Sequence, residues 1–336
     1  KSGTNRIFVM SDHTTSWSGV RLTQNYDTEF QRFSLGSNIE LRQVEGSPNI
    51  GHRRSVIGSV WAKEEFVLGP VTLAGYGRYD QYMKKSYTGF GTDVSLKLID
   101  EVSLFAGVSR SRRVPTYQEL YWTDSTVTRT TPLEAEKHLQ LEAGAGLTLS
   151  DGSYARAAYF HRTVEDAIVI IPDLIIPTIF PALQFTSVPK VVTNGVEMKV
   201  GIRVWVLYLE GTATYLIQTS GGFDTQLFPR LMAIGGVYYW NKLLDDKLEF
   251  KIGFRGRYQS SHIGAEFNPQ VLTYVASAGP VLGQASSGDF FLTAHIGDAY
   301  IHLMWENLTN VRYFSTPFYP VLDRAFRLGV SWEFLN

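Results

Sequence analysis

The chain has 336 residues and a formal net charge of −1, so its charge favours neither nucleic acid nor another strongly charged partner. It contains no cysteine, which excludes a disulfide framework and a thiolate metal site. Aromatic residues make up 13% of the chain and glycine occurs 30 times, a mixture typical of many strands joined by turns.

Neither a signal peptide nor a membrane-spanning helix is predicted. Residues 1–12 lack the apolar core of a signal peptide, so we expect either a mature product or a chain whose beginning is missing. The longest apolar region, 167–183, is interrupted by Pro172, Pro177 and Pro181 and carries the charge of Asp173. Such a segment does not form a spanning helix.

Apolar and polar residues alternate in segments along the whole chain. The clearest are 33–42, 133–149, 207–215, 247–257 and 326–334, with weaker ones near 53–65, 69–80, 88–98, 102–110, 191–203, 230–243, 289–297 and 299–308. A period of two places one kind of side chain on each face of a strand. The sequence therefore predicts an all-β fold with about 14 to 16 strands and no amphipathic helix.

Short and long connections alternate between these segments. The short ones are Gly69-Pro70, Asp100-Glu101, Asp151-Gly152, Asp245-Asp246 and Gly297-Asp298, and the long ones cover about 111–132, 172–190, 218–229, 263–288 and 309–322. Antiparallel strands with tight turns at one rim and long loops at the other form a transmembrane up-and-down β-barrel.

Strand length favours a barrel in lipid over a soluble sandwich. Several segments alternate for about 10 residues or more, enough to cross a bilayer at a tilt, whereas strands of soluble proteins usually have about 5 or 6. Aromatic residues fit girdles at the two membrane interfaces, at Trp61, Tyr121-Trp122, Tyr238-Tyr239-Trp240, Trp305 and Trp332. By parity, the hydrated inner face is expected to carry His138, Gln140, Glu142, Lys251, Arg255, His302 and Glu306.

Two sequence blocks resemble signatures of the TonB-dependent outer-membrane receptor family. In "SRSRRVPTYQELYW" the matching residues are Arg113, Pro115, Thr116, Glu119, Leu120 and Tyr121, followed by a Leu-x-x-Glu element at Leu133 and Glu136. In "WENLTNVRYFSTPFYPVLDRAFRLGVSWEF" they are Glu306, Asn307, Leu308, Thr309, Arg312, Tyr313, Arg324, Phe326, Leu328, Gly329 and Phe334. The resemblance implies an outer-membrane receptor that binds a scarce nutrient, such as a ferric siderophore, haem or cobalamin. It also implies import driven by TonB acting on a plug domain.

The chain departs from a complete receptor of this family. Nothing in it resembles the N-terminal plug or the energy-coupling box, and the predicted strands are fewer than the roughly 22 of a receptor barrel. Leu335 and Asn336 follow the terminal aromatic residue. We therefore interpret residues 1–336 as the C-terminal portion of an outer-membrane barrel domain.

Candidate ligand-binding residues fall in two places. Arg110, Arg112 and Arg113 form the most notable basic cluster, which could attract an anionic ligand or lipopolysaccharide phosphates, or be an ordinary solvated strand end. The apolar segment 172–185, with Ile176 and Phe180, could pack on itself, touch a hydrophobic ligand or contact a partner.

No catalytic, metal or cofactor site is predicted. The 7 histidines lack metal-ligand spacing, and no nucleophile elbow or phosphate loop occurs in a proper context. The sequence thus predicts a protein that is not an enzyme, placed in the bacterial outer membrane among lipid and lipopolysaccharide. A passive porin of about 16 strands and a structural barrel subunit of a larger assembly remain open as alternatives.

Overall fold

The computed structural model describes residues 14–123, 127–129, 132–173, 182–245, 247–268, 271–276, 279–317 and 319–333. Among the residues proposed above for ligand binding or for the two family signatures, Ile176, Phe180 and Phe334 lie outside these ranges.

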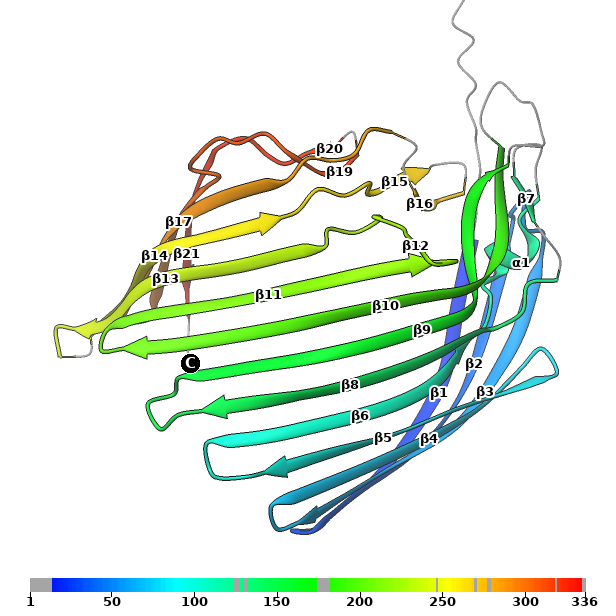
Figure 1. Cartoon of the computed structure of the whole chain (residues 1–336), viewed down its shortest axis with the longest axis horizontal. Helices are drawn as coiled ribbons and strands as arrows, with labels where there is room; N and C mark the ends of the chain where they lie inside the picture. Colours follow the sequence, from blue (N-terminus) through cyan, green and yellow to red (C-terminus); the bar gives the residue numbers. More distant parts are fainter. Residues whose placement is uncertain are drawn as a thin grey trace, which may run out of the picture.

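One large sheet dominates the described ranges and holds 17 strands, which Figure 1 shows curving round as a single wall. They are β1 (Thr14–Asp27), β2 (Gln31–Glu45), β3 (Arg53–Leu68), β4 (Val71–Tyr82), β5 (Lys85–Lys97), β6 (Val102–Arg113), β7 (Val127–Arg129), β8 (Glu136–Thr148), β9 (Tyr154–Asp173), β10 (Ala182–Val204), β11 (Leu207–Ser220), β12 (Phe223–Asp224), β13 (Leu231–Leu243), β14 (Leu248–Gln259), β17 (Ala285–Ile296), β18 (Ala299–Glu306) and β21 (Ala325–Trp332). β7 and β12 have only 3 and 2 residues, so 15 of the 17 strands are long. The predicted all-β fold with about 14 to 16 strands is confirmed.

Several small elements lie in the long connections at the rim of the wall. They are the helix α1 (Tyr117–Tyr121) and the two hairpins β15 (Ala265–Asn268) with β16 (Thr273–Ala276) and β19 (Phe314–Thr316) with β20 (Tyr319–Pro320). None of the helical structure in the described ranges is long and apolar enough to cross a bilayer.

Consecutive long strands pair antiparallel from β1 to β21, so the predicted up-and-down topology is confirmed. The short strand β7 is the exception, since it pairs parallel to β10. Within the part of the chain that the structure describes, the cross-strand registers pair β1 with β2 and β21 with β18 and give neither strand a second partner.

Cross-strand register divides the side chains between two faces of the wall. One row of paired residues, Leu96, Leu104, Ala145, Ala157, Met198 and Ala213, crosses six strands and is apolar throughout. The adjacent row on the opposite face is mixed: Ser95, Phe105, Gly144, Ala158, Glu197 and Thr214. We call the apolar side the outer face and the mixed side the inner face. All seven residues predicted to face inward lie on the inner face.

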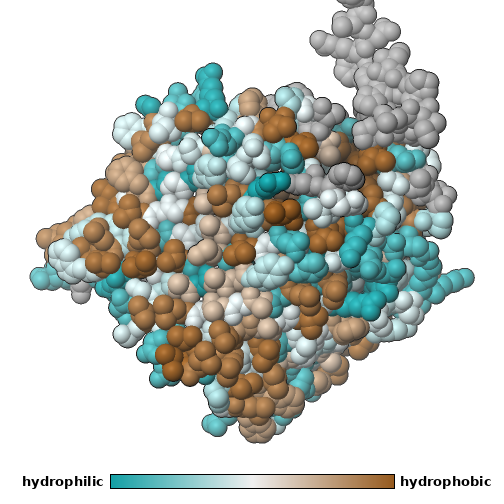
Figure 2. Space-filling model, viewed as in Figure 1, coloured by the Kyte–Doolittle hydropathy of each residue, from teal (hydrophilic) through white to brown (hydrophobic). Residues whose placement is uncertain are grey.

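The outer face meets the exterior and not a second protein layer. On β21, Phe326, Leu328, Val330 and Trp332 are all more than half exposed, at 56, 63, 64 and 59%. Figure 2 shows apolar side chains exposed in patches across the wall. Exposure of so much apolar surface is unfavourable in water and favourable in lipid, which agrees with a transmembrane barrel.

Short turns lie at one end of the strands and longer connections at the other (Figure 1). In the predicted Asp151-Gly152 turn, Gly152 has a φ of +86°, a conformation that glycine adopts without steric cost. Asp151 Oδ1 accepts the Ser153 backbone N–H at 2.8 Å, and this hydrogen bond holds the pKa of the Asp151 carboxyl below its usual value. The turn between β10 and β11 at Trp205 and Val206 contains neither glycine nor proline and escaped sequence-based detection.

The prediction of a loop over 172–190 was wrong for residues 182–190, which belong to a strand. β9 continues to Asp173, and β10 begins at Ala182, so that Phe185 pairs with Ile170. Pairing extends beyond the apolar belt because side chains from both strands pack into a buried cluster at the rim. Phe185 is only 4% exposed.

That buried cluster lies at the long-loop rim. It consists of Val44, Ile50, Trp122, Val127, Leu133, Leu183, Phe185, Val271 and Val275, with Tyr117, Leu120, Tyr121, Ile168 and Ile170 packed against it. Its members come from both ends of the sheet order: Val44 is on β2, whereas Val275 belongs to the connection between β14 and β17. Figure 1 shows β15 and β16 reaching toward the side of the wall that carries α1 and β7. We call these residues the rim cluster.

Candidate ligand-binding site

Arg113 ties three elements together at the inner side of the rim. Its guanidinium donates to Glu136 of β8 at 2.6 and 2.8 Å and to Glu119 of α1 at 3.1 Å twice. Glu136 also accepts the backbone N–H of Ile168 from β9 at 2.7 Å, and His138 lies 2.8 Å from its second oxygen. Paired bidentate contacts of this kind fix geometry as well as supply energy. The structure therefore gives Arg113 and Glu119 of the first sequence block, and Glu136 of the element that follows it, one shared role.

The helix α1 begins with a capping box. Thr116 Oγ1 accepts the backbone N–H of Glu119 at 3.2 Å, and Glu119 Oε2 accepts the N–H of Thr116 at 2.7 Å. These reciprocal bonds satisfy donors that a helix N-terminus leaves open. The helix was not predicted, although Thr-x-x-Glu is a recognised start signal, because α1 is too short to show a helical period.

The second sequence block is anchored by Asn307, which is 5% exposed. Its side chain donates to the carbonyls of Val311 and Leu322 at 3.0 and 3.2 Å and accepts the N–H of Val311 at 3.1 Å. Its backbone N–H donates to the buried Asp289 at 3.0 Å. Asn307 thus organises the connection between β18 and β21.

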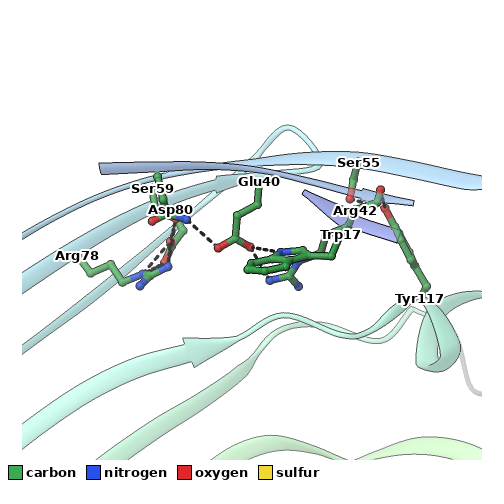
Figure 3. A network of polar contacts seen from close by, with 9 residues as sticks. Trp17, Glu40, Arg42, Ser55, Ser59, Arg78, Asp80 and Tyr117 are labelled. Atoms are coloured by element: carbon green, nitrogen blue, oxygen red, sulfur yellow. Dashed lines mark hydrogen bonds and ion pairs between the residues drawn. The ribbon is translucent and has the colours of Figure 1, made fainter. Parts of the chain in front are cut away.

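A polar network covers the inner face of β1 to β4 below the rim (Figure 3). Glu40 accepts hydrogen bonds from Trp17 Nε1 at 3.3 Å, Arg42 Nη2 at 2.9 Å and Asn38 Nδ2 at 2.9 Å. The side chains of Glu40 and Arg42 lie two positions apart on one strand, and so on one face. The Arg42 side chain keeps 47% of its surface exposed.

A second ion pair extends the network. Arg78 Nε donates to both oxygens of Asp80 at 2.8 and 2.9 Å, and its Nη2 donates to Ser59 Oγ at 3.1 Å. Tyr117 of α1 bonds to Ser55 and donates to the Arg42 carbonyl at 3.3 Å. The helix is thereby attached to the wall beside Arg42.

Two adjoining cavities of about 400 and 410 Å³ lie between this network and the rim. Arg42, Tyr82, Val114 and Thr116 line both. The first is charged, with Glu40, Arg78, Asp80 and Arg113 in its lining. The second is mainly apolar and aromatic, with Trp17, Val44, Tyr117, Trp122 and Leu272. Together they can hold a ligand that has both an apolar part and hydrogen-bond acceptors.

The predicted basic cluster is divided between the two faces. Register pairs Arg113 with Glu136 on the inner face, whereas Arg110 pairs with Leu139 on the outer face, and Arg112 pairs with Lys137 beside it. Arg112 and Arg113 both line the charged cavity, whereas Arg110 does not. The guanidinium of Arg113 is held by two carboxylates, and a part of these arginines in ligand binding stays a prediction.

The remaining predicted residues take varied positions. Pro115 is buried and Leu120 packs against the rim cluster. Leu308 donates its N–H to the Gly288 carbonyl at 2.8 Å. Phe326 is exposed on the outer face, and Gly329 is exposed on the inner face opposite His302.

The sequence reading missed Glu40, Arg42, Arg78 and Asp80. A signal was present, since Glu-x-Arg and Arg-x-Asp on a strand place opposite charges side by side on one face. Among the described residues, no group of three His, Asp or Glu side chains is placed to hold a metal ion.

Comparison with known proteins identifies the family. The family model described as "TonB dependent receptor-like, beta-barrel" matches residues 2–295. A search by sequence among curated proteins finds no match.

Solved structures with the same fold are distant in sequence. The FrpB iron transporter from Neisseria meningitidis (F5-1 variant) is 15% identical over 96% of this chain and 56% of its own, with a TM-score of 0.74. A mutant of the ferric enterobactin receptor PfeA from Pseudomonas aeruginosa is 16% identical over 96% and 54%, with a TM-score of 0.75. The siderophore receptor PirA from Acinetobacter baumannii is 14% identical over 96% and 55%, with a TM-score of 0.71.

The chain therefore spans about half the length of the solved proteins that it resembles. Proteins of the matching family are receptors and transporters of the bacterial outer membrane, not enzymes. The match to its barrel model, the antiparallel wall and the two anchored sequence blocks agree: this chain belongs to the TonB-dependent receptor family and forms part of its β-barrel.

Proposed function

We propose that the protein is an outer-membrane receptor that captures a small iron-bearing ligand, such as a ferric siderophore, and imports it with energy delivered through TonB. The two adjoining cavities at the long-loop rim carry this proposal. They combine partly exposed guanidinium groups with aromatic walls, in a family whose members act on scarce nutrients. The family assignment speaks against the alternative of a passive porin.

The chemistry of the cavities suits an iron chelate. Arg42 and Arg78 keep 47 and 48% of their side-chain surface exposed although each is paired with a carboxylate. A guanidinium has five N–H donors, so each retains donors for carboxylate or phenolate oxygens of a chelate. Trp17, which is 65% exposed, offers a flat apolar surface for the organic part of the ligand.

We further propose that residues 1–336 are the C-terminal portion of a larger barrel domain, and that a plug domain couples this barrel to TonB. Two observations support this. The chain spans about half the length of the solved proteins that it resembles, and β1 and β21 have no pairing with each other in the described ranges. The membrane partners would be lipid and lipopolysaccharide.

Uptake of radioactive iron by cells that make the full-length protein tests the function. Ferric siderophores should enter only in cells with TonB, and an R42Q/R78Q variant should bind the ferric ligand more weakly in purified form. An R21Q/R255Q variant makes the same change of charge at exposed inner-face positions outside the two cavities, and it should bind normally. Uptake that does not need TonB, together with an open-channel conductance, would support a porin and overturn the proposal.

A further inference from the structure

A separate cavity of about 400 Å³ lies on the inner face, close to the short turns and away from the two rim cavities. Strands β13, β14, β17 and β18 form it, and its lining consists of Trp240, Glu249, Lys251, Thr293, His295 and Tyr300. Its volume falls within the range of small-molecule sites, about 300 to 1,000 Å³. We call it the lower cavity. Because the short turns of an outer-membrane barrel face the periplasm, the lower cavity lies at the periplasmic end of the inner face.

The lower cavity repeats an arrangement of side chains found at the rim. There, Trp17 and Arg42 are register partners, and the indole N–H of Trp17 donates at 3.3 Å to the glutamate two positions before Arg42. In the lower cavity Trp240 and Lys251 are register partners, and the indole N–H of Trp240 donates at 2.7 Å to Glu249, again two positions before the cation. In both places the strand with the glutamate and the cation runs toward the rim, and the tryptophan is on the strand before it. The same three types of side chain therefore stand at both ends of the inner face, on opposite sides of the curved wall (Figure 1).

Lys251 differs from Arg42 in having no carboxylate partner. Arg42 is paired with its glutamate at 2.9 Å. Within the described ranges Lys251 has no ion pair or hydrogen bond, and its ammonium lies 3.5 Å from the centroid of the Tyr238 ring and 5.8 Å from that of Phe291. The residue is half-buried, and its ammonium has three N–H donors. Lys251 is therefore placed to bind an anion from outside the chain.

The two neighbouring carboxylates are engaged by aromatic donors. Glu249 accepts the indole N–H of Trp240, and Glu210 accepts the hydroxyl of Tyr238 at 3.2 Å. Neither forms an ion pair with Lys251 in the part of the chain that the structure describes. The positive charge of Lys251 is thus not neutralised by a direct partner on the wall.

Flat ring surfaces complete the lower cavity. The imidazole of His295 stacks on the phenol of Tyr300, with 4.1 Å between the ring centroids and 6° between the planes. Trp240 adds an indole ring, and Thr293, the register partner of Lys251, adds a hydroxyl. Aromatic rings pack against other flat rings, and the ammonium attracts negatively charged oxygens. The lower cavity therefore fits a planar aromatic group that carries anionic oxygens, such as a catecholate.

We propose that the lower cavity is a second binding site for the imported iron chelate, occupied as the chelate leaves the inner face for the periplasm. The inference rests on the proposed function and adds a position on the import route. The ligand class is an anionic chelate with aromatic arms, because the lower cavity repeats the side-chain types of the rim. One ammonium stands in place of the guanidinium groups of Arg42 and Arg78, and it lacks their planar fork of donors. Binding in the lower cavity is therefore weaker than at the rim, which allows release.

The test measures binding of a synthetic ferric tris-catecholate chelate, labelled with radioactive iron, to the full-length protein by equilibrium dialysis. Detergent solution leaves both ends of the protein open to the chelate, and wild type is expected to show a tighter and a weaker class of site. Lys251→Gln should weaken the second class by about tenfold or more, because a hydrogen bond to a charged group contributes at least about that factor. Lys251→Arg keeps the cation and should retain both classes. R42Q/R78Q should lose the tighter class and keep the weaker one.

Two further variants separate ligand binding from effects on folding. Trp240→Phe releases Glu249 to pair with Lys251, so it should weaken the second class without removing a charge. The matched control is Lys199→Gln. The ammonium of Lys199 also lies over a tyrosine, 5.5 Å from the centroid of the Tyr154 ring, but Lys199 is exposed and does not line the lower cavity. This control should bind the chelate like wild type, and the melting temperatures of all variants should agree.

A single class of site in wild type, or a second class unchanged in Lys251→Gln, would overturn the lower cavity as a ligand site. If Lys251→Gln left both classes intact and raised the ion conductance of the full-length protein in planar bilayers, Lys251 would be a contact of the plug, and the inference would be rejected. Failure of the proposed function gives a different pattern. In that case the tighter class would be missing from wild type or unchanged in R42Q/R78Q.

Discussion

The indole ring of Trp61 covers Gly36 of the neighbouring strand. The two residues are register partners on β3 and β2, and a Cβ at residue 36 would lie 2.2 Å from Cε2 of the indole. The same arrangement of an inner-face aromatic ring against a partner glycine recurs at Tyr76 with Gly91, Phe105 with Gly144, Tyr154 with Gly201 and Phe160 with Gly195. Ring packing over glycine shields backbone that no side chain covers and helps to fix strand register.

Substituting alanine for Gly36 is therefore expected to destabilise the barrel. The added methyl group would push Trp61 from its position, and overpacking of this kind costs about 1 to 3 kcal/mol. Equilibrium unfolding in urea with the protein in lipid vesicles measures the change. The control is Gly58→Ala on β3, where a Cβ meets nothing within 4 Å. It should be neutral or slightly stabilising because alanine restricts the unfolded chain. Equal losses in both variants would contradict the packing role of Trp61.

Replacing Arg113 with lysine should weaken the rim although the charge is kept. A lysine ammonium lacks the planar fork of five N–H donors with which the guanidinium bonds to Glu119 and Glu136 at once. Removing one partner of a fully buried pair costs about 3 to 5 kcal/mol. Because the Arg113 side chain is 38% exposed, we expect about 2 kcal/mol after allowance for solvent screening.

The matched control for Arg113→Lys is Arg312→Lys. Arg312 pairs with Asp323, and their side chains are 75 and 58% exposed, so the expected loss is below about 1 kcal/mol. Unfolding free energies of both variants decide the comparison, and limited proteolysis between residues 114 and 135 reports whether α1 has come loose. A neutral Arg113→Lys variant would show that the double clamp is not needed.

At Asn307, two effects can be separated by two substitutions. Asn307 has a φ of 49°, a left-handed conformation that costs alanine about 1 to 2 kcal/mol and glycine almost nothing. Asn307→Gly removes only the side-chain hydrogen bonds, whereas Asn307→Ala adds backbone strain. The alanine variant should therefore be less stable than the glycine variant by about 1 kcal/mol, and both should be less stable than wild type. The melting temperatures of the three proteins in one detergent give this order, and any other order contradicts it.

Val271 and Leu272 are adjacent, but we expect aspartate substitutions at the two positions to have different effects on proteolytic cleavage. Val271 is fully buried, at 0% exposure, in the rim cluster, whereas Leu272 is 48% exposed. A buried aspartate without a partner is costly, so Val271→Asp should detach the 260–284 connection and raise its rate of proteolytic cleavage by about tenfold or more, the equivalent of about 1.4 kcal/mol. Leu272→Asp should leave the rate near that of wild type. Similar cleavage of both variants would mean that this connection is not held by the rim cluster.

Strand positions and faces were open to prediction because they depend on neighbours along the chain. Phe326, Leu328, Val330 and Trp332 alternate with polar residues, and the structure places all four on the outer face. The same parity separates Arg110 and Arg112 from Arg113, although reading the three as one cluster obscured it. β1 was missed because Ser16, Ser18 and Gln24 share the outer face with Val20 and Leu22 and blur the period of two.

The aromatic girdle could be predicted only in part. Tyr239, Trp305 and Trp332 lie on the outer face by register, whereas Trp61, Tyr238 and Trp240 face inward and Trp122 is buried in the rim cluster. An aromatic residue in a strand can face lipid on the outer face or pack over a glycine of the next strand on the inner face. Sequence alone does not say which residue of the next strand lies opposite.

The sequence by itself determined the strands, their up-and-down order and the division into two faces, because a period of two is a local property of the chain. Only the tertiary structure decided the rim. Gln118 Nε2 donates to the carbonyl of Val271, 153 positions away, and Arg42 and Tyr82 come to line one cavity with Leu272. Such contacts depend on how far the wall has curved and on where each long loop lands, and neither is encoded in the alternation of neighbouring residues.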